Sequence, residues 1–298
     1  MRLSRIAFAV SVLLAGILAQ GSVRADERVK VVASFTILAD FVRNIGGDHV
    51  DVVALVGPNA DAHVYTPSPA DAKTIAAAKL VVVNGLGFEG WLPRLVKSSG
   101  SNARIVVATE GIVPLKDTPG GHHSVDPHAW QAVPNAKIYV ENIGRALAEV
   151  DPSSAESYRA NAARYVVQLD VLDRDVRATV AQIPESRRKV ISTHGAFGYF
   201  AAAYGVAFVA PLGVSTDSEP SARDLASIIA QIRKEKIPAI FLENISDPRL
   251  IRRVAAETGA KIGGTLYSDS LTDEKGEAPT YIDMVRHNIK TLQDALDK

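Results

Sequence analysis

The chain has 298 residues and no cysteine, and its 33 Lys and Arg balance 33 Asp and Glu to a formal net charge of zero. Nucleic acid or an anionic membrane requires a basic face, so we expect neither as a partner. The lack of cysteine excludes disulfides, thiol nucleophiles and thiolate metal ligands. Any bound metal must therefore be held by His, Asp, Glu or backbone oxygen.

The first 25 residues have the pattern of a secretory signal peptide. Arg2 and Arg5 precede an apolar run from Ile6 to Ala19, and Val23-Arg24-Ala25 forms a small-x-small cleavage site. We therefore expect a mature protein that begins near Asp26 and is exported to the periplasm. A bacterial lipid anchor needs a cysteine at the cleavage site, so we also expect a protein that is not lipid-anchored.

From residue 29 onward, short β-branched runs alternate with amphipathic segments, which is typical of parallel α/β sheets. Helix ends are marked by Gly46-Gly47 after the first helix and by Ser68-Pro69 at the start of the second. The first half thus predicts strands at 29–34, 50–55, 80–84 and 105–108, and helices at 36–46, from 69, at 91–98 and at 134–150.

The longest uninterrupted helical pattern runs from Asp151-Pro152 to Pro184. Its apolar residues recur every three or four positions, namely Tyr158, Ala162, Tyr165, Leu169, Leu172, Val176, Val180 and Ile183. Some thirty residues make a rod of roughly 45 Å. A coiled coil is the alternative, but a single stripe between two α/β segments favours a helix that links two lobes.

The second half predicts strands at 189–193, 206–211, 239–243 and 261–265, and helices at 197–204, 221–234, 248–258 and 280–296. We therefore predict an α/β fold of two lobes, each with a parallel β-sheet flanked by helices, joined by one long linking helix. The predicted division is a signal peptide at 1–25, an N-terminal lobe at 26–151, the linking helix at 152–184 and a C-terminal lobe at 185–298.

Four potential metal ligands follow predicted strands. His63 comes after the second strand, His128 after the fourth, His194 at the end of the fifth and Asp269 after the last. Open parallel sheets bind ligands beyond the carboxyl ends of their strands, so these residues can converge between the lobes. Three imidazoles and a carboxylate suit tetrahedral Zn²⁺, whereas a carboxylate in place of one imidazole favours Mn²⁺.

The neighbouring polar residues leave alternatives open. Asp217 and Asp273 compete with Asp269 as the acidic ligand. Three further carboxylates are either acceptors for the N–H of a metal-bound imidazole or ordinary caps and surface groups: Glu89, Asp126 and Glu243. His122 and His123 lie in a Gly- and Pro-rich loop and are either solvated or an auxiliary site that recruits metal.

Several motifs resemble the metal-binding solute-binding proteins of ABC importers, the family that includes receptors of the ZnuA, TroA and PsaA type. The motifs are Asn84-Gly85-Leu86-Gly87-Phe88-Glu89-Gly90-Trp91, Asp126-Pro127-His128-Ala129-Trp130, the histidine that ends the fifth strand and Tyr267-Ser268-Asp269. The resemblance covers essentially the whole mature chain. It is closest to the zinc-specific AztC-like branch, which shares Gln131-Ala132-Val133-Pro134-Asn135-Ala136-Lys137 and Glu243-Asn244-Ile245-Ser246-Asp247.

The resemblance implies two lobes joined by a rigid helix, with His63, His128, His194 and Asp269 as the metal ligands. It implies a periplasmic receptor, not an enzyme, that captures Zn²⁺ in the inter-lobe cleft and delivers it to an ABC importer. The expected partners are an inner-membrane permease with its cytoplasmic ATPase, and a periplasmic metallochaperone is a further candidate; we expect a monomer. The alternatives are a manganese or iron receptor, a zinc-dependent hydrolase with Asp269 as base, and a surface adhesin.

Overall fold

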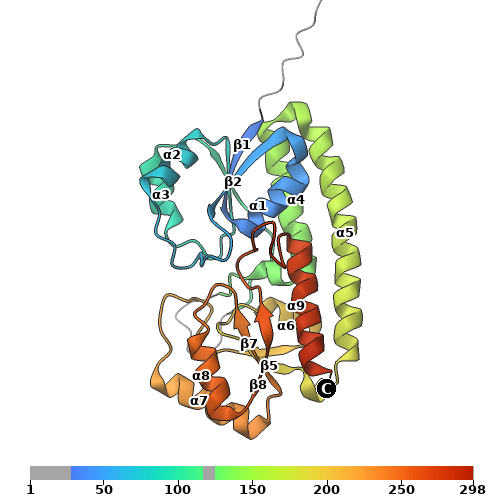
Figure 1. Ribbon diagram of the computed structural model, residues 1–298. Coiled ribbons are helices and arrows are strands. Elements are labelled where there is room, and N and C mark those ends of the chain that lie inside the picture. The colour runs from blue at the N-terminus through green and yellow to red at the C-terminus, as the bar shows by residue number, and fades with distance from the viewer. Residues whose placement is uncertain (1–27, 117–124, 298) are drawn as a thin grey trace, which may run out of the picture.

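The computed structural model describes residues 28–116 and 125–297, so the predicted signal peptide lies outside the described residues. The chain forms two lobes, one above the other in Figure 1, with a long helix running along both. Each lobe contains a four-stranded sheet. Within the described segments, no helix has both the length and the apolar character needed to cross a bilayer.

The first sheet has the strand order β2-β1-β3-β4, and all of its strand pairs are parallel. Its strands are β1 (Val29–Phe35), β2 (Val50–Val56), β3 (Leu80–Val83) and β4 (Arg104–Val107). The helices of this lobe are α1 (Thr36–Gly46), α2 (Pro69–Ala77), α3 (Leu92–Ser99) and α4 (Val133–Val150). Helix α2 begins as predicted, because Ser68 and Asp71 form a capping box around Pro69.

The second sheet has the order β6-β5-β7-β8 and is also parallel. Its strands are β5 (Lys189–Ile191), β6 (Ala207–Val209), β7 (Ala239–Glu243) and β8 (Lys261–Leu266), and its helices are α6 (Gly198–Tyr204), α7 (Ala222–Glu235), α8 (Arg249–Thr258) and α9 (Tyr281–Leu296). The strand order reverses between β1 and β3 in one sheet and between β5 and β7 in the other. This is the position at which open α/β sheets bind ligands.

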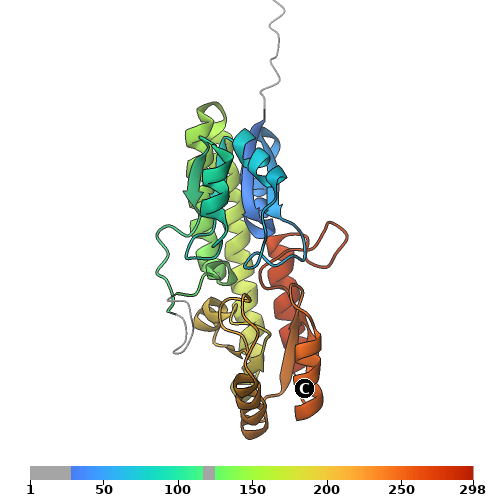
Figure 2. The same ribbon diagram turned by 90° about the vertical axis from the view of Figure 1, so that its left-hand side faces the viewer.

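The linking helix α5 (Ala155–Gln182) has 28 residues, which corresponds to about 42 Å. It buries most of the predicted apolar stripe, namely Tyr158, Tyr165, Leu169, Leu172, Val176 and Val180. Helix α9 lies beside α5. Both helices extend from the level of the first lobe to that of the second (Figures 1 and 2). One continuous apolar core therefore includes Phe41 of the first lobe, Leu172 of α5 and Phe241 of the second lobe.

Helix α9 also docks on the first lobe, a contact that the sequence pattern did not predict. The buried carboxylate of Asp40, on α1, accepts the Tyr281 backbone N–H at 3.0 Å and the Tyr165 hydroxyl at 3.4 Å. Tyr281 is the first residue of α9, so Asp40 satisfies one of the N–H groups that a helix leaves unpaired at its start. Burial raises the pKa of Asp40 to about 6, despite the hydrogen bond from Tyr281 that favours the charged form.

We predict that Asp40→Asn stabilises the protein at pH 7.5 but not at pH 4. The pKa of Asp40 is raised on folding, so ionisation costs stability as the pH rises through about 4 to 6. Each pKa unit corresponds to about 1.4 kcal/mol, so we expect a gain of roughly 1–3 kcal/mol at the higher pH. Urea unfolding at both pH values measures this gain, and a variant that is destabilised at both would contradict it.

Candidate metal centre

The four predicted ligands meet between the lobes. His63 lies in the loop between β2 and α2, and His128 lies directly before the 3₁₀ turn Ala129–Gln131 that leads into α4. His194 follows β5 and Asp269 follows β8. Loops at the carboxyl ends of the two sheets thus bring one potential ligand atom from each residue to within 4.8 Å of the others. The alternatives Asp217 and Asp273 are exposed and lie outside this group.

The distances between these atoms fit a single metal ion. Nε2 of His128 lies 3.2 Å from Nε2 of His63 and 3.4 Å from Nε2 of His194. Asp269 Oδ2 lies 3.1 Å from His194 Nε2 and 3.3 Å from His63 Nε2. Zinc bonds of 2.0–2.2 Å in a tetrahedron separate the ligand atoms by roughly 3.3–3.6 Å. These four separations are close to the edges of such a tetrahedron, and all four ligand atoms lie within 4.8 Å of one another, so the group can surround one cation.

Two of the imidazoles are oriented by buried carboxylates. Asp126 Oδ1 accepts from His128 Nδ1 at 2.8 Å, and Glu243 Oε2 accepts from His194 Nδ1 at 2.5 Å. Because a carboxylate accepts at Nδ1, the Nε2 of each ring in its neutral form has a lone pair that faces the centre of the group. Glu243 Oε1 also accepts the backbone N–H of His194 at 3.0 Å, which fixes the end of β5. Of the two alternatives for Asp126 and Glu243, these contacts favour the acceptor for an imidazole N–H.

For Glu89 the structure favours the other alternative, a carboxylate that caps backbone N–H groups. Its Oε1 accepts the Ser34 hydroxyl and the Asn84 backbone N–H, both at 2.6 Å, and its Oε2 accepts the Gly85 N–H at 3.1 Å. Glu89 therefore braces the carboxyl ends of β1 and β3. A five-residue separation from Asn84 gives no sign of this contact, because it depends on a tight turn through Gly85, whose φ is 84°.

Residues that the sequence reasoning missed hold Asp269 in place. The Trp130 indole N–H donates to the Ser268 carbonyl oxygen at 2.9 Å, and the Gln131 amide donates to the same oxygen at 2.6 Å. The Asp269 side chain is fully buried, yet its Oδ1 accepts no hydrogen bond from any described residue. Burying an unpaired carboxylate oxygen is costly, so a cation at this position would relieve the penalty.

The carboxylates of the centre also determine where protons are held. Burial opposes charge on the histidines, but Asp269 and Asp126 outweigh it and raise the pKa of His128 to about 9. In the same way, Glu243 and Asp269 overcome burial and raise the pKa of His194 well above its ordinary value. Burial dominates at His63 and lowers its pKa. In the absence of a cation, protons on His128 and His194 therefore offset the charge of Asp269 and of the carboxylates bonded to their Nδ1 atoms.

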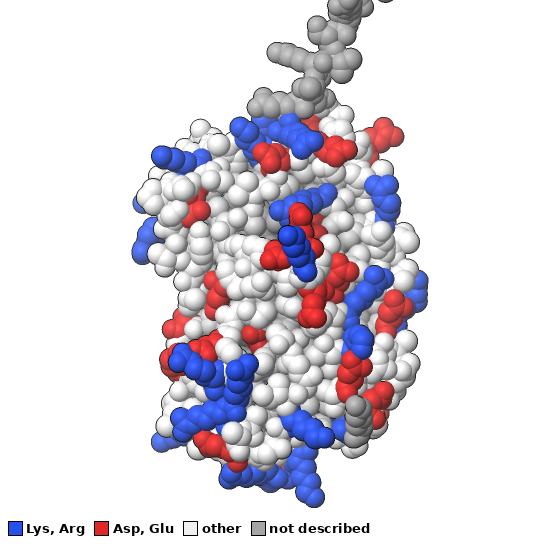
Figure 3. Space-filling view, in the orientation of Figure 1, with Lys and Arg blue, Asp and Glu red and all other residues white. Residues whose placement is uncertain are grey.

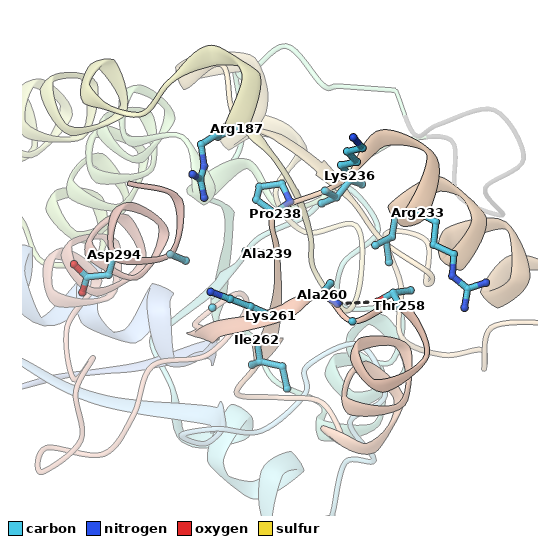
Figure 4. Close-up of a pocket in the computed structure, with 15 residues that line it drawn as sticks. Arg187, Arg233, Lys236, Pro238, Ala239, Thr258, Ala260, Lys261, Ile262 and Asp294 are labelled. Carbon is cyan, nitrogen blue, oxygen red and sulfur yellow. Dashed lines mark hydrogen bonds between the residues drawn. The ribbon is translucent and has the colours of Figure 1, made fainter. Parts of the chain in front are cut away.

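Two predicted site residues lie outside the described part of the chain, and one large pocket lies away from the metal centre. His122 and His123 fall within 117–124, outside the described residues. A pocket of about 700 Å³ lies at the other end of the second sheet, beside the starts of β7 and β8, where Arg187 and Lys261 line it (Figure 4). Basic side chains are also concentrated around the base of this lobe in Figure 3. This pocket contains no histidine and is unsuited to a cation.

Comparison with known proteins places the chain in a family. Residues 31–295 match ZnuA, described as the periplasmic component A of the zinc-uptake complex. The iron-binding protein YfeA of Yersinia pestis is 36% identical over 89% of this chain and 86% of its own length. The manganese-binding lipoprotein MntA of Bacillus subtilis is 34% identical over 91% of each.

A solved structure has the same fold. The periplasmic zinc-binding protein TroA of Treponema pallidum aligns with a TM-score of 0.86 and 31% identity, over 91% of this chain and all of that one. The fold, the motifs and the cluster of potential ligand atoms therefore point to the same family. The chain belongs to the ZnuA family, the periplasmic metal-binding receptors of ABC importers.

Proposed function

We propose that His63, His128, His194 and Asp269 bind one Zn²⁺ and that the protein delivers it to the permease and ATPase of an ABC importer. The supporting observation is the set of three imidazole nitrogens and one carboxylate oxygen whose neighbouring members lie 3.1–3.4 Å apart. Imidazole suits Zn²⁺, whereas oxygen-rich sites suit Mn²⁺. The resemblance to the zinc-specific AztC-like branch favours the same cargo.

The second candidate cargo is Mn²⁺ or Fe²⁺. Besides its Oδ2, Asp269 offers Oδ1, which lies 3.6 Å from His128 Nε2 and accepts no hydrogen bond from described residues. A carboxylate that binds through both oxygens makes a five-coordinate, more oxygen-rich site, which suits a harder cation than zinc. The relatives named for manganese and iron add weight to this candidate.

The proposed centre suits transport better than catalysis. Four protein ligands close a tetrahedron, whereas a catalytic zinc keeps one position for water or substrate. A hydrolase would need Asp269 as a base, but its Oδ2 lies against His63 and His194. We further propose a monomer, free in the periplasm, with a metallochaperone as a further partner.

The proposed division into lobes at 26–151 and 185–298 is supported by the strands, which occupy 29–107 and 189–266. Helix α5 lies between these two sets of strands. The auxiliary role of His122 and His123 remains a proposal that rests on the sequence alone.

We predict that the stripped mature protein retains one zinc per chain after dialysis against equal Zn²⁺, Mn²⁺ and Fe²⁺ under reducing conditions. His128→Ala should lose this zinc, because it removes a ligand and leaves Asp126 without its imidazole partner. His49→Ala is the matched control, since His49 contacts Ser154 and lies outside the centre. Elemental analysis measures the metal content of each protein. Retention of manganese or iron instead of zinc would favour the second candidate cargo.

We predict that His194→Glu moves the preference towards Mn²⁺ by at least roughly tenfold, because it replaces imidazole nitrogen with oxygen. The new carboxylate would face Glu243, so the double variant with Glu243→Gln is the matched comparison. Competition between Zn²⁺ and Mn²⁺, followed by metal analysis, gives the ratio. An unchanged ratio in both variants would exclude His194 as a ligand.

We predict that zinc affinity falls as the pH decreases from about 9. The raised pKa values mean that His128 and His194 must each lose a proton before metal binds. Displacing one to two protons weakens binding by roughly 10-fold to 100-fold per pH unit. Chelator competition between pH 6 and 8 tests this, with proton release followed by an indicator in weak buffer. Equal affinity across that range would contradict it.

A further inference from the structure

The loop that carries His63 is hydrogen-bonded to the second lobe. The Asn59 backbone N–H donates to the Leu271 carbonyl oxygen at 3.0 Å. The Thr216 hydroxyl donates to Asp61 Oδ2 at 2.6 Å. Both bonds connect the segment between β2 and α2 to segments that follow β6 and β8. The first lobe thus reaches across the metal centre through the loop that supplies one of its ligands.

The two carboxylate oxygens of Asp61 accept hydrogen bonds from different lobes. Oδ1 accepts the His63 backbone N–H at 2.9 Å, while Oδ2 accepts the Thr216 hydroxyl. His128 and His194 are each held by a carboxylate at Nδ1, but no described residue provides a carboxylate there for His63. The position of His63 therefore depends on its backbone, and Asp61 connects that backbone to the second lobe.

Thr216 is well placed to connect the two sides of the centre. It lies in the segment between β6 and α7, which has no regular secondary structure. The start of this segment is tied to the end of β5, because the Gly195 N–H donates to the Gly213 carbonyl oxygen at 2.9 Å. The segment thus runs from beside His194 to the loop of His63. Long irregular segments in compact proteins are usually functional.

We propose that the Asp61–Thr216 hydrogen bond is a latch that controls how fast the metal leaves, with Asp61 as a positioning residue for His63. This inference rests on the proposed function. The His63 side chain is 5% exposed, whereas those of His128, His194 and Asp269 are fully buried. The metal therefore leaves as the His63 loop lifts from the second lobe, and lifting requires this bond to break.

The test is zinc release from three full-length mature variants. Thr216→Val keeps the shape of the side chain but removes the hydroxyl, and Thr216→Ser restores it. Thr74→Val is the matched control, because the exposed Thr74 hydroxyl bonds only within α2, to the Ala70 carbonyl oxygen. Each variant is loaded with one equivalent of Zn²⁺ and mixed with excess chromogenic chelator in a stopped-flow instrument, and the melting temperature of the metal-free protein is recorded.

We expect Thr216→Val to release zinc roughly tenfold faster than wild type, the change that loss of one charge-assisted hydrogen bond produces. Its zinc stoichiometry should be unchanged and its metal-free melting temperature lowered by only about 2–5 °C, and Thr216→Ser and Thr74→Val should release at the wild-type rate. Wild-type release from Thr216→Val, or fast release from Thr216→Ser, would overturn the latch alone. A wild-type protein that retains no zinc would overturn the proposed function and the latch together.

Discussion

The buried carboxylate of Asp269 is the charge around which the rest of the centre is arranged. Three imidazoles whose Nε2 atoms lie this close would repel one another if all were protonated. If all were neutral, the negative charge of the Asp269 carboxylate would have no positive partner. Without metal, the carboxylates beside His128 and His194 offset the repulsion between their protonated rings, and these rings hold the pKa of Asp269 well below its usual range despite its burial. A divalent cation resolves this conflict better, because it neutralises Asp269 while the imidazoles return to their neutral form.

This arrangement requires two sheets whose carboxyl ends stay at a fixed separation. Helices α5 and α9 provide that separation, because the apolar core that they bury is continuous from Phe41 to Phe241. Opening the lobes widely would expose this core to water. Each Å² of apolar surface exposed costs about 25 cal/mol. Asp40 adds a polar contact at the start of α9. Rearrangement of the loops is therefore less costly than hinging, and the metal must enter and leave through loop movement.

Local patterns in the sequence were sufficient for the elements and for the positions of the proposed ligands. The α5 stripe and the capping serines Ser68 and Ser221 predict helix position, since both depend on residues a few positions apart. Strand ends predict the cleft, because parallel sheets present their carboxyl ends together. Contacts between distant segments were beyond such rules. The apolar face of α9 predicts only that it packs, and nothing local connects Asp40 to Tyr281, or Asp61 to Thr216.

The four proposed ligands differ in how firmly they are held, and this difference suggests how one site could combine tight capture with release. His128 and His194 are fixed by carboxylates from their own vicinity, and Asp269 by the anchoring of Ser268 to Trp130 and Gln131. His63 is held through Asp61, which accepts the His63 backbone N–H and, with its other oxygen, the Thr216 hydroxyl of the second lobe. A permease that displaces the Thr216 segment would weaken one ligand and leave three in place. Release then requires the loss of one coordination bond first, which is a smaller barrier than dismantling the whole centre at once.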